Sequence, residues 1–284
     1  MPHLASNQNS KKLDEAIPGE NLNILIGNIP LNKEEGSKAK ILSILKEKYN
    51  IEEKDFLSAE IEFVPSFPAK NLGFDESMIA AYGQDDRICA YTSLKALIEI
   101  EKPKNTCICL FTDKEEIGSM GNTGMMSQAF DNFITKLLVK TNVNPYEINE
   151  VYFNSKMLSA DVGAAIDSTY KDVQEINNAS FISHGVEINK YTGSKGKSGA
   201  SDANAEYVAY IRKILEENNI TYQISELGKV DLGGGGTIAY ILANKGIDVI
   251  DCCIPLLSMH SPYEVSSKFD IYMAYKTYKT FYKN

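Results

Sequence analysis

Two adjacent glutamates, Glu115 and Glu116, follow an apolar run at residues 106–111 and precede three closely spaced glycines. The run is mostly apolar, aromatic or β-branched without alternation, which predicts a strand that is buried on both faces. Ligand sites of open α/β sheets lie beyond the carboxyl ends of the strands. Because neighbouring side chains point in different directions, one glutamate could bind an ion while the other faces a substrate. A solvated acidic turn is the simpler alternative for such a pair.

Three further candidates, Asp85, Asp161 and His260, fall at comparable places, just past a predicted strand or at a strand-to-helix turn. Carboxylates with one imidazole suit a pair of divalent ions such as zinc, cobalt or manganese, with one carboxylate bridging the two. Water between such ions becomes a strong nucleophile, and a spare carboxylate can remove its proton. Taken singly, Asp85 could cap a helix, Asp161 could belong to a turn, and His260 could be a core histidine.

The pattern from residue 74 onward alternates strands with helices, which predicts an α/β fold with a largely parallel sheet sandwiched by helices. The strands that matter for the candidates are predicted at 106–111, 150–153, 221–227 and 247–255. Helices are predicted at 88–98, around 126–137, at 233–242 and after Ser267, which can cap the last one.

The first 70 or so residues have a different pattern and predict a small α+β piece. Short strands are expected at 22–26 and 57–63, with a helix at 37–49 between them. Pro65, Pro68 and Gly73 then punctuate the chain. We therefore predict two domains, 1–73 and 74–284.

The composition limits the possible partners. The 284 residues include 43% hydrophobic and 24% charged residues, and the formal charge of -9 argues against a nucleic-acid binder, which needs a basic face. No apolar stretch approaches the length of a membrane span, so no membrane association is expected. The five cysteines form no CxxC pair. They are expected to be buried thiols in a reducing compartment, which favours a cytoplasmic location.

Four segments together resemble the metal motifs of the M18 metallo-aminopeptidases, the family of aspartyl aminopeptidase and vacuolar aminopeptidase I. The segments are residues 83–86, 113–119, 159–161 and 258–261, and the intervening Lys190 and glycines 233–236 match as well. The resemblance covers nearly the whole chain and is closest to the bacterial branch. It implies a zinc-exopeptidase-like fold with a smaller α+β dimerisation domain, and an enzyme that releases acidic or neutral N-terminal residues from peptides.

The resemblance also implies a role for each candidate residue. Asp85 corresponds to the ligand that bridges two divalent ions, most simply zinc, and Glu115 to the general base. Glu116, Asp161 and His260 correspond to terminal ligands, Lys190 to a substrate-pocket residue, and the backbone near Gly235 to a wall of that pocket. Members of the family commonly assemble from dimers into dodecamers, so a homo-oligomer is implied.

One departure from the family is a metal-binding histidine in an upstream stretch that family members carry. The three histidines here are His3, His184 and His260, and none matches it. His3 lies in a segment that resembles the inserted dimerisation domain, so we expect the sequence to start in the middle of the protein, with 1–73 as a remnant of that domain. Without the upstream histidine the second ion should bind poorly. The dimerisation-domain histidine that reaches a neighbouring site is represented by His3 or replaced by Asn7.

Other functions remain possible at this point. The chain could be a relative that has lost catalysis and serves assembly or peptide binding, or an aminopeptidase of the M42 or M28 type. The lysine-rich tract at 190–197 lacks the spacing of a phosphate-binding loop. It is either a solvated loop or a cationic spot suited to an acidic substrate side chain. The complete set of acids favours the enzyme.

Overall fold

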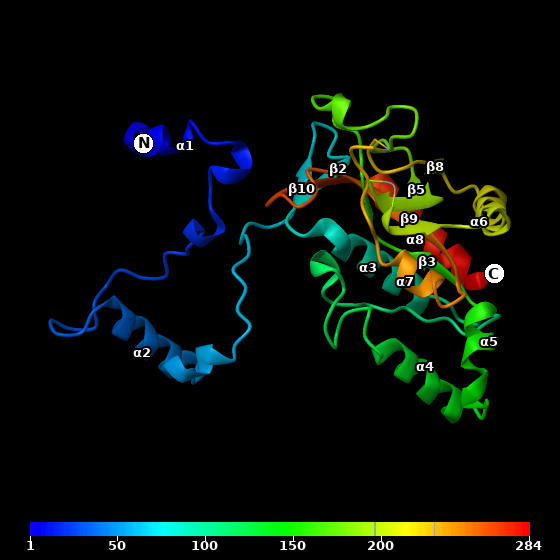
Figure 1. Cartoon of the computed structure of the whole chain (residues 1–284), viewed down its shortest axis with the longest axis horizontal. Helices are drawn as coiled ribbons and strands as arrows, with labels where there is room; N and C mark the ends of the chain where they lie inside the picture. The colour runs from blue at the N-terminus through cyan, green and yellow to red at the C-terminus, as the bar shows by residue number, and fades with distance from the viewer. Residues whose placement is uncertain (196, 230) are drawn as a thin grey trace. The chain divides into compact units, whose positions relative to one another are not determined.

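The computed structural model of the protein describes residues 1–195, 197–229 and 231–284 (Figure 1). The chain divides into two compact units, Met1–Ser66 and Phe67–Asn284, which we call the N-terminal unit and the main unit. Among the described residues, no helix combines the length and the apolar character that a membrane crossing requires. The identity of residues 1–73 as a dimerisation domain stays a prediction.

The N-terminal unit contains two α-helices, α1 (Pro2–Gln8) and α2 (Ser37–Tyr49). Helix α2 confirms the helix predicted at 37–49. The strands predicted at 22–26 and 57–63 are wrong, because both segments run without strand pairing. Leu25 and Leu57 are 90% and 92% exposed. Neither segment has a partner strand within the described chain.

The main unit is built on one mixed sheet in which β9 is the central strand. The strands are β1 (Lys70–Leu72), β2 (Met78–Ala81), β3 (Lys156–Ser159), β4 (Val162–Ala164), β5 (Val186–Asn189), β8 (Tyr222–Ile224), β9 (Asp248–Leu257) and β10 (Glu264–Ser267). Their order is β1-β2-β10-β9-β5-β8, and β3 and β4 also pair with β9. Strands β6 (Tyr191–Ser194) and β7 (Ser198–Asp202) pair separately.

The sheet is less parallel than the pattern predicts. Strand β9 is parallel to β3 and β4 but antiparallel to β5 and β10. The connection from β9 to β10 spans only residues 258–263, and such a short connection can return the chain only as an antiparallel neighbour. The predicted α/β class is confirmed.

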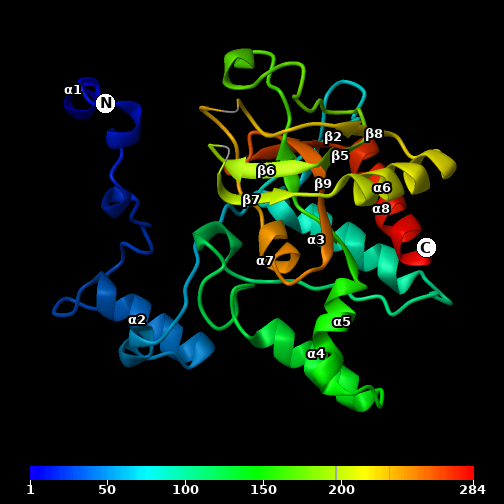
Figure 2. The same ribbon diagram turned by 45° about the vertical axis from the view of Figure 1, so that its right-hand side comes forward.

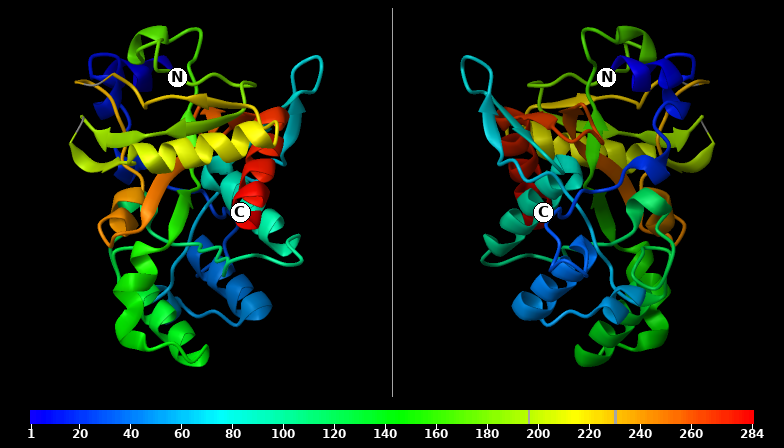
Figure 3. Two further views of the ribbon diagram at one scale, coloured as in Figure 1. Left: turned by 90° about the vertical axis from the view of Figure 1, so that its right-hand side faces the viewer. Right: turned by 90° about the vertical axis from the view of Figure 1, so that its left-hand side faces the viewer.

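Helices pack on both faces of this sheet (Figures 2 and 3). They are α3 (Gln84–Ile98), α4 (Ala129–Lys140), α5 (Ile148–Phe153), α6 (Ala205–Glu217), α7 (Ala239–Ala243) and α8 (Lys268–Lys283). Alternate residues of β9, among them Ile250 and Cys252, join a cluster with α3, α6 and α8, while Val249 joins a second cluster with α4, α5 and α7. Successive side chains of β9 therefore point to opposite faces of the sheet, and each face packs on its own set of helices.

Three predicted elements differ in the structure. Residues 106–111 form no strand within the described chain, and Phe111 is 54% exposed, so they are not a buried strand. No described segment supplies the neighbouring strands that such burial requires. Residues 150–153 belong to α5, which follows a turn capped by the Asn144 side chain. Of the helix predicted at 233–242, only α7 forms. Strand β9 and the Ser267 cap of α8 are confirmed.

Candidate metal centre

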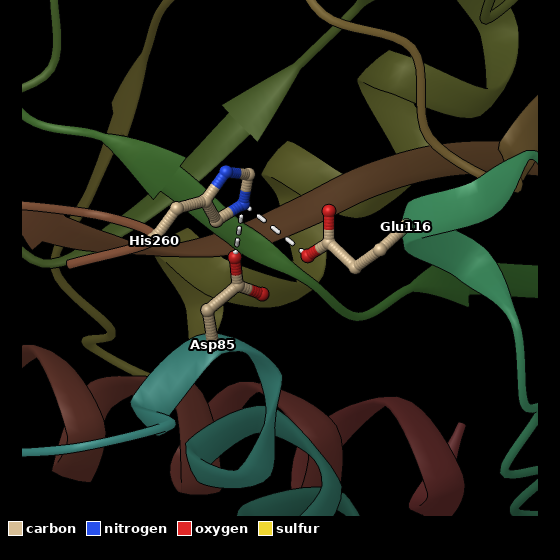
Figure 4. Close-up of side chains that lie close together, drawn as sticks. All are labelled: Asp85, Glu116 and His260. Carbon is tan, nitrogen blue, oxygen red and sulfur yellow. Dashed lines mark ion pairs between the residues drawn. The ribbon is translucent and has the colours of Figure 1, made fainter. Parts of the chain in front are cut away.

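Three loops bring Asp85, Glu116 and His260 together (Figure 4). Asp85 lies at the start of α3, shortly after β2, Glu116 lies in a 3₁₀ turn, and His260 lies between β9 and β10. The His260 Nε2 atom is 2.9 Å from Asp85 Oδ2 and 3.2 Å from Glu116 Oε1. Elements that are far apart in the sequence thus meet at one imidazole nitrogen.

The geometry of this cluster fits a zinc ion. One ligand atom from each of the three side chains lies within 4.8 Å of the others. Zinc binds nitrogen and oxygen at about 2.0–2.2 Å in tetrahedral geometry, which places ligand atoms about 3.3 Å apart. The observed separations of 2.9 Å and 3.2 Å need only a small expansion to accept the ion. Glu116 and His260 are exposed, so solvent or a substrate can reach the remaining position.

The loop that carries Glu116 is held in shape by its own hydrogen bonds. The Asp113 carboxylate accepts the Lys114 amide at 2.9 Å, and the Ser119 amide donates to the Lys114 carbonyl at 2.7 Å. A Cβ at Gly124 would lie 2.1 Å from the Ser119 carbonyl oxygen. Only glycine permits this close approach, which gives a structural reason for Gly124 after the acid pair.

Burial and neighbouring charges raise the pKa of two acids at the site, Asp85 and Glu115. Burial, followed by the charge of Glu116, raises the pKa of Asp85 to about 6. Burial, followed by the charges of Glu116 and Asp85, also raises the pKa of Glu115. Such a cluster must take up either protons or a cation, because like charges close together disfavour full ionisation.

Asp161 lies beside this cluster rather than among its three members. It precedes β4 and accepts the Val162 amide at 2.7 Å through its side chain. Burial raises its pKa well above the usual range, and the charges of Asp85 and Glu115 add to the effect. The structure therefore brings Asp85, Glu116 and His260 into contact and leaves Asp161 and Glu115 within electrostatic range.

The family is decided by comparison with known proteins. The sequence profile described as "Aminopeptidase I zinc metalloprotease (M18)" matches residues 1–282. The chain belongs to the M18 family. The alternative assignments to M42 or M28 are thereby excluded.

Bacterial M18 proteins resemble this chain over its full length. It is 52% identical over 288 residues to the "Probable M18 family aminopeptidase 1" of Clostridium acetobutylicum, covering 100% of this chain and 62% of that protein. A crystal structure of the M18 aminopeptidase from Thermotoga maritima aligns with a TM-score of 0.94 at 44% identity, covering 100% of this chain and 63% of that one. The chain thus spans less than two thirds of the length of these relatives.

The two residues that the M18 resemblance assigns to substrate binding lie on neighbouring loops outside the three-residue cluster. Lys190 follows β5, is exposed and forms an ion pair with Asp202. The Gly235 carbonyl accepts the Gly193 amide at 3.0 Å, which joins the glycine loop to β6. Their roles in substrate binding stay predictions.

Glu264, which no sequence pattern indicated, is a buried acid that touches the three-residue cluster. It begins β10, four residues after His260, and its side chain contacts the backbone of the cluster rather than a side chain. An acidic residue at the start of a short, polar strand carries no sequence signal for such contacts.

Proposed function

We propose that this chain carries the metal centre of an aminopeptidase, which hydrolyses the first peptide bond of a peptide with the help of two divalent ions, most simply zinc. The convergence of His260 with Asp85 and Glu116 is the observation that carries this proposal. Solvated surface acids have no reason to converge on one imidazole nitrogen, whereas metal ligands do, and the raised pKa of Asp85 is typical of a functional site.

The positions of the acids support a bridging role for Asp85. One of its oxygens faces His260, and its charge acts on Asp161 as well as on Glu115. We assign Glu116 and His260 to one ion and Asp161 to the other, with Asp85 shared between them.

Bound divalent ions would lower the pKa of a water molecule and polarise the carbonyl of the scissile bond. The Glu115 carboxylate then accepts a proton from the water as the new C–O bond forms. It returns this proton to the amide nitrogen as the C–N bond breaks, so that the amino acid and the shortened peptide leave. A raised pKa, as Glu115 has, suits a group that both accepts and donates a proton.

The substrate preference and the assembly are parts of the same proposal. Lys190 supports acidic or neutral N-terminal residues, because it is a cation on an exposed loop of an acidic protein. The exposed Leu25 and Leu57 of the N-terminal unit support burial against a second copy. We therefore propose that residues 1–73 form part of a dimerisation domain and that the protein is a dimer-based homo-oligomer.

The adjacent glutamates offer a matched test in the full-length product of the gene. Glu115→Gln should retain zinc but lower the turnover of short peptides by about a thousandfold, since it removes the proton acceptor. Glu116→Gln, the same chemical change one residue later, should instead lower the zinc content. Metal content and peptide turnover check both variants. A fully active Glu115→Gln variant would show that the assigned base is wrong.

A further inference from the structure

Glu264 contacts two of the proposed ligand residues through their backbones. The residue is 2% exposed. One carboxylate oxygen accepts the His260 amide at 2.8 Å, and the other accepts the Asp85 amide at 3.1 Å. A single buried carboxylate thus joins the loop after β9 to the start of α3.

The backbone at both ends of this contact has a conformation that needs stabilisation. His260 has φ 63°, in the left-handed region that non-glycine residues rarely adopt. Asp85 has non-helical dihedral angles at the start of α3 (φ -76°, ψ 114°). An acceptor at each amide favours these conformations over the ordinary alternatives.

Glu264 is itself held firmly in place. The Gln84 side-chain amide donates to the Glu264 carbonyl at 2.7 Å and to the Ile79 carbonyl at 3.2 Å. The Ser266 hydroxyl donates to the Gln84 side chain in turn. Pairing of Glu264 with Ala81 in the sheet adds to this support. The carboxylate therefore has a fixed position from which it can define the two amides.

We propose that Glu264 is a positioning residue, which sets the spacing of Asp85 and His260 so that their side chains meet one cation. This inference rests on the proposed metal centre and adds a group that touches no ion itself. Its buried negative charge also stands behind the ligands and favours a cation between them. Groups that orient metal ligands affect affinity nearly as strongly as the ligands do.

Asp270 provides a matched control because it has the same chemistry elsewhere in the fold. It is fully buried in α8 and accepts the Ser183 amide at 2.6 Å and the Gly185 amide at 2.7 Å. These contacts involve no residue of the metal cluster. If Glu264 only stabilises a loop, as Asp270 does, substitution of either carboxylate should have the same effect on zinc affinity and on Tm.

The test measures zinc affinity of the chain by competition with a chromophoric chelator, alongside the Tm of each metal-free variant. In Glu264→Gln the side-chain NH2 faces one of the two amides, so zinc affinity should fall about 10–100-fold. Glu264→Asp keeps the charge but shortens the reach, and it should weaken binding as well. Asp270→Asn should lower the Tm but keep zinc affinity within about twofold of the unaltered chain.

The outcomes test the positioning role of Glu264 separately from the metal centre. Zinc binding by Glu264→Gln that equals that of the unaltered chain, or an equal loss in Asp270→Asn, would overturn the positioning role and leave the metal centre standing. Wild-type affinity in Glu264→Asp would show that charge rather than position matters, and would also overturn it. Failure of the unaltered chain to bind zinc would contradict the metal centre and the positioning role together.

Discussion

Two carboxylates of the main unit, Asp85 and Asp251, have similar proton affinity but opposite surroundings. Burial is the first cause of a pKa of about 6 in both. Asp251 lies within β9 and accepts the Thr237 hydroxyl at 2.7 Å and the Thr192 hydroxyl at 3.3 Å. Asp85 instead faces an imidazole and the carboxylate of Glu116, whose charge raises its pKa further.

The neighbours of the two carboxylates distinguish a structural acid from a candidate metal ligand. Around Asp251, neutral hydroxyls donate to the carboxylate, and the Thr237 hydroxyl also accepts the Ala239 amide at the start of α7. The charge of the buried Glu187 adds a smaller effect that raises the pKa of Asp251. Around Asp85, a second acid faces the same nitrogen, so only a proton or a cation can balance the charges. A raised pKa alone does not distinguish the two sites, but the neighbours do.

The largest expected effect is stabilisation by zinc. At a concentration about a thousandfold above its Kd, zinc should add about 4 kcal/mol to the free energy of unfolding. His260→Ala should lose most of this gain because one of three clustered ligands is removed. Asp251→Asn, a change on the same strand-and-loop segment, should retain it. Thermal unfolding with zinc and with chelator checks all three proteins, and an undiminished gain in His260→Ala would contradict the cluster.

A second effect should appear only at Asp251, the structural carboxylate. Asp251→Ala leaves the Thr192 and Thr237 hydroxyls without their acceptor in a buried site. This should lower the free energy of unfolding by about 3 kcal/mol while zinc affinity per folded molecule stays unchanged. Urea unfolding and zinc titration together check the result. A loss of zinc affinity would mean that the two carboxylates are not independent.

The smallest effect concerns pH. An unperturbed Asp has a pKa of 3.8, whereas Asp85 and Asp251 have a pKa of about 6 in the folded chain. Between these values the folded state binds more protons than the unfolded state. The free energy of unfolding of the metal-free chain should therefore fall as the pH rises from about 4 to about 7, by about 2 kcal/mol for buried Asp251 alone.

Zinc binding and the substitution of Asp251 should each remove a different part of this pH dependence. Zinc favours ionised Asp85 and should remove the share of the decline that Asp85 contributes, whereas Asp251→Asn should remove the share of Asp251 with or without zinc. Urea unfolding across the pH range, in chelator and in zinc, measures both shares. A metal-free chain that grows more stable as the pH rises through this range would contradict the raised pKa values.

Part of the candidate site could be predicted from the sequence because one of its residues, His260, follows a recognisable strand. The apolar run of β9 and the polar loop after it placed His260 correctly at a sheet edge, and the motif order related it to Asp85 and Glu116. The Ser267 cap of α8 was also evident. Such features are local, and each is encoded within a few neighbouring residues.

The remainder depends on contacts between distant segments. Glu264 acts through two backbone amides, which no pattern of residue types can reveal. The run at 106–111 has strand propensity, but strands need neighbours, and no described segment pairs with it. Strand β10 was missed because four residues beginning at Glu264 are too short and too polar to show a period.

The most direct test of the account is anomalous diffraction from crystals of the protein grown with zinc. We expect a zinc peak within about 2.0–2.2 Å of His260 Nε2 and of carboxylate oxygens of Asp85 and Glu116. A zinc peak at unrelated residues, with His260 still hydrogen-bonded to Asp85, would contradict the central claim that these loops converge to hold a cation.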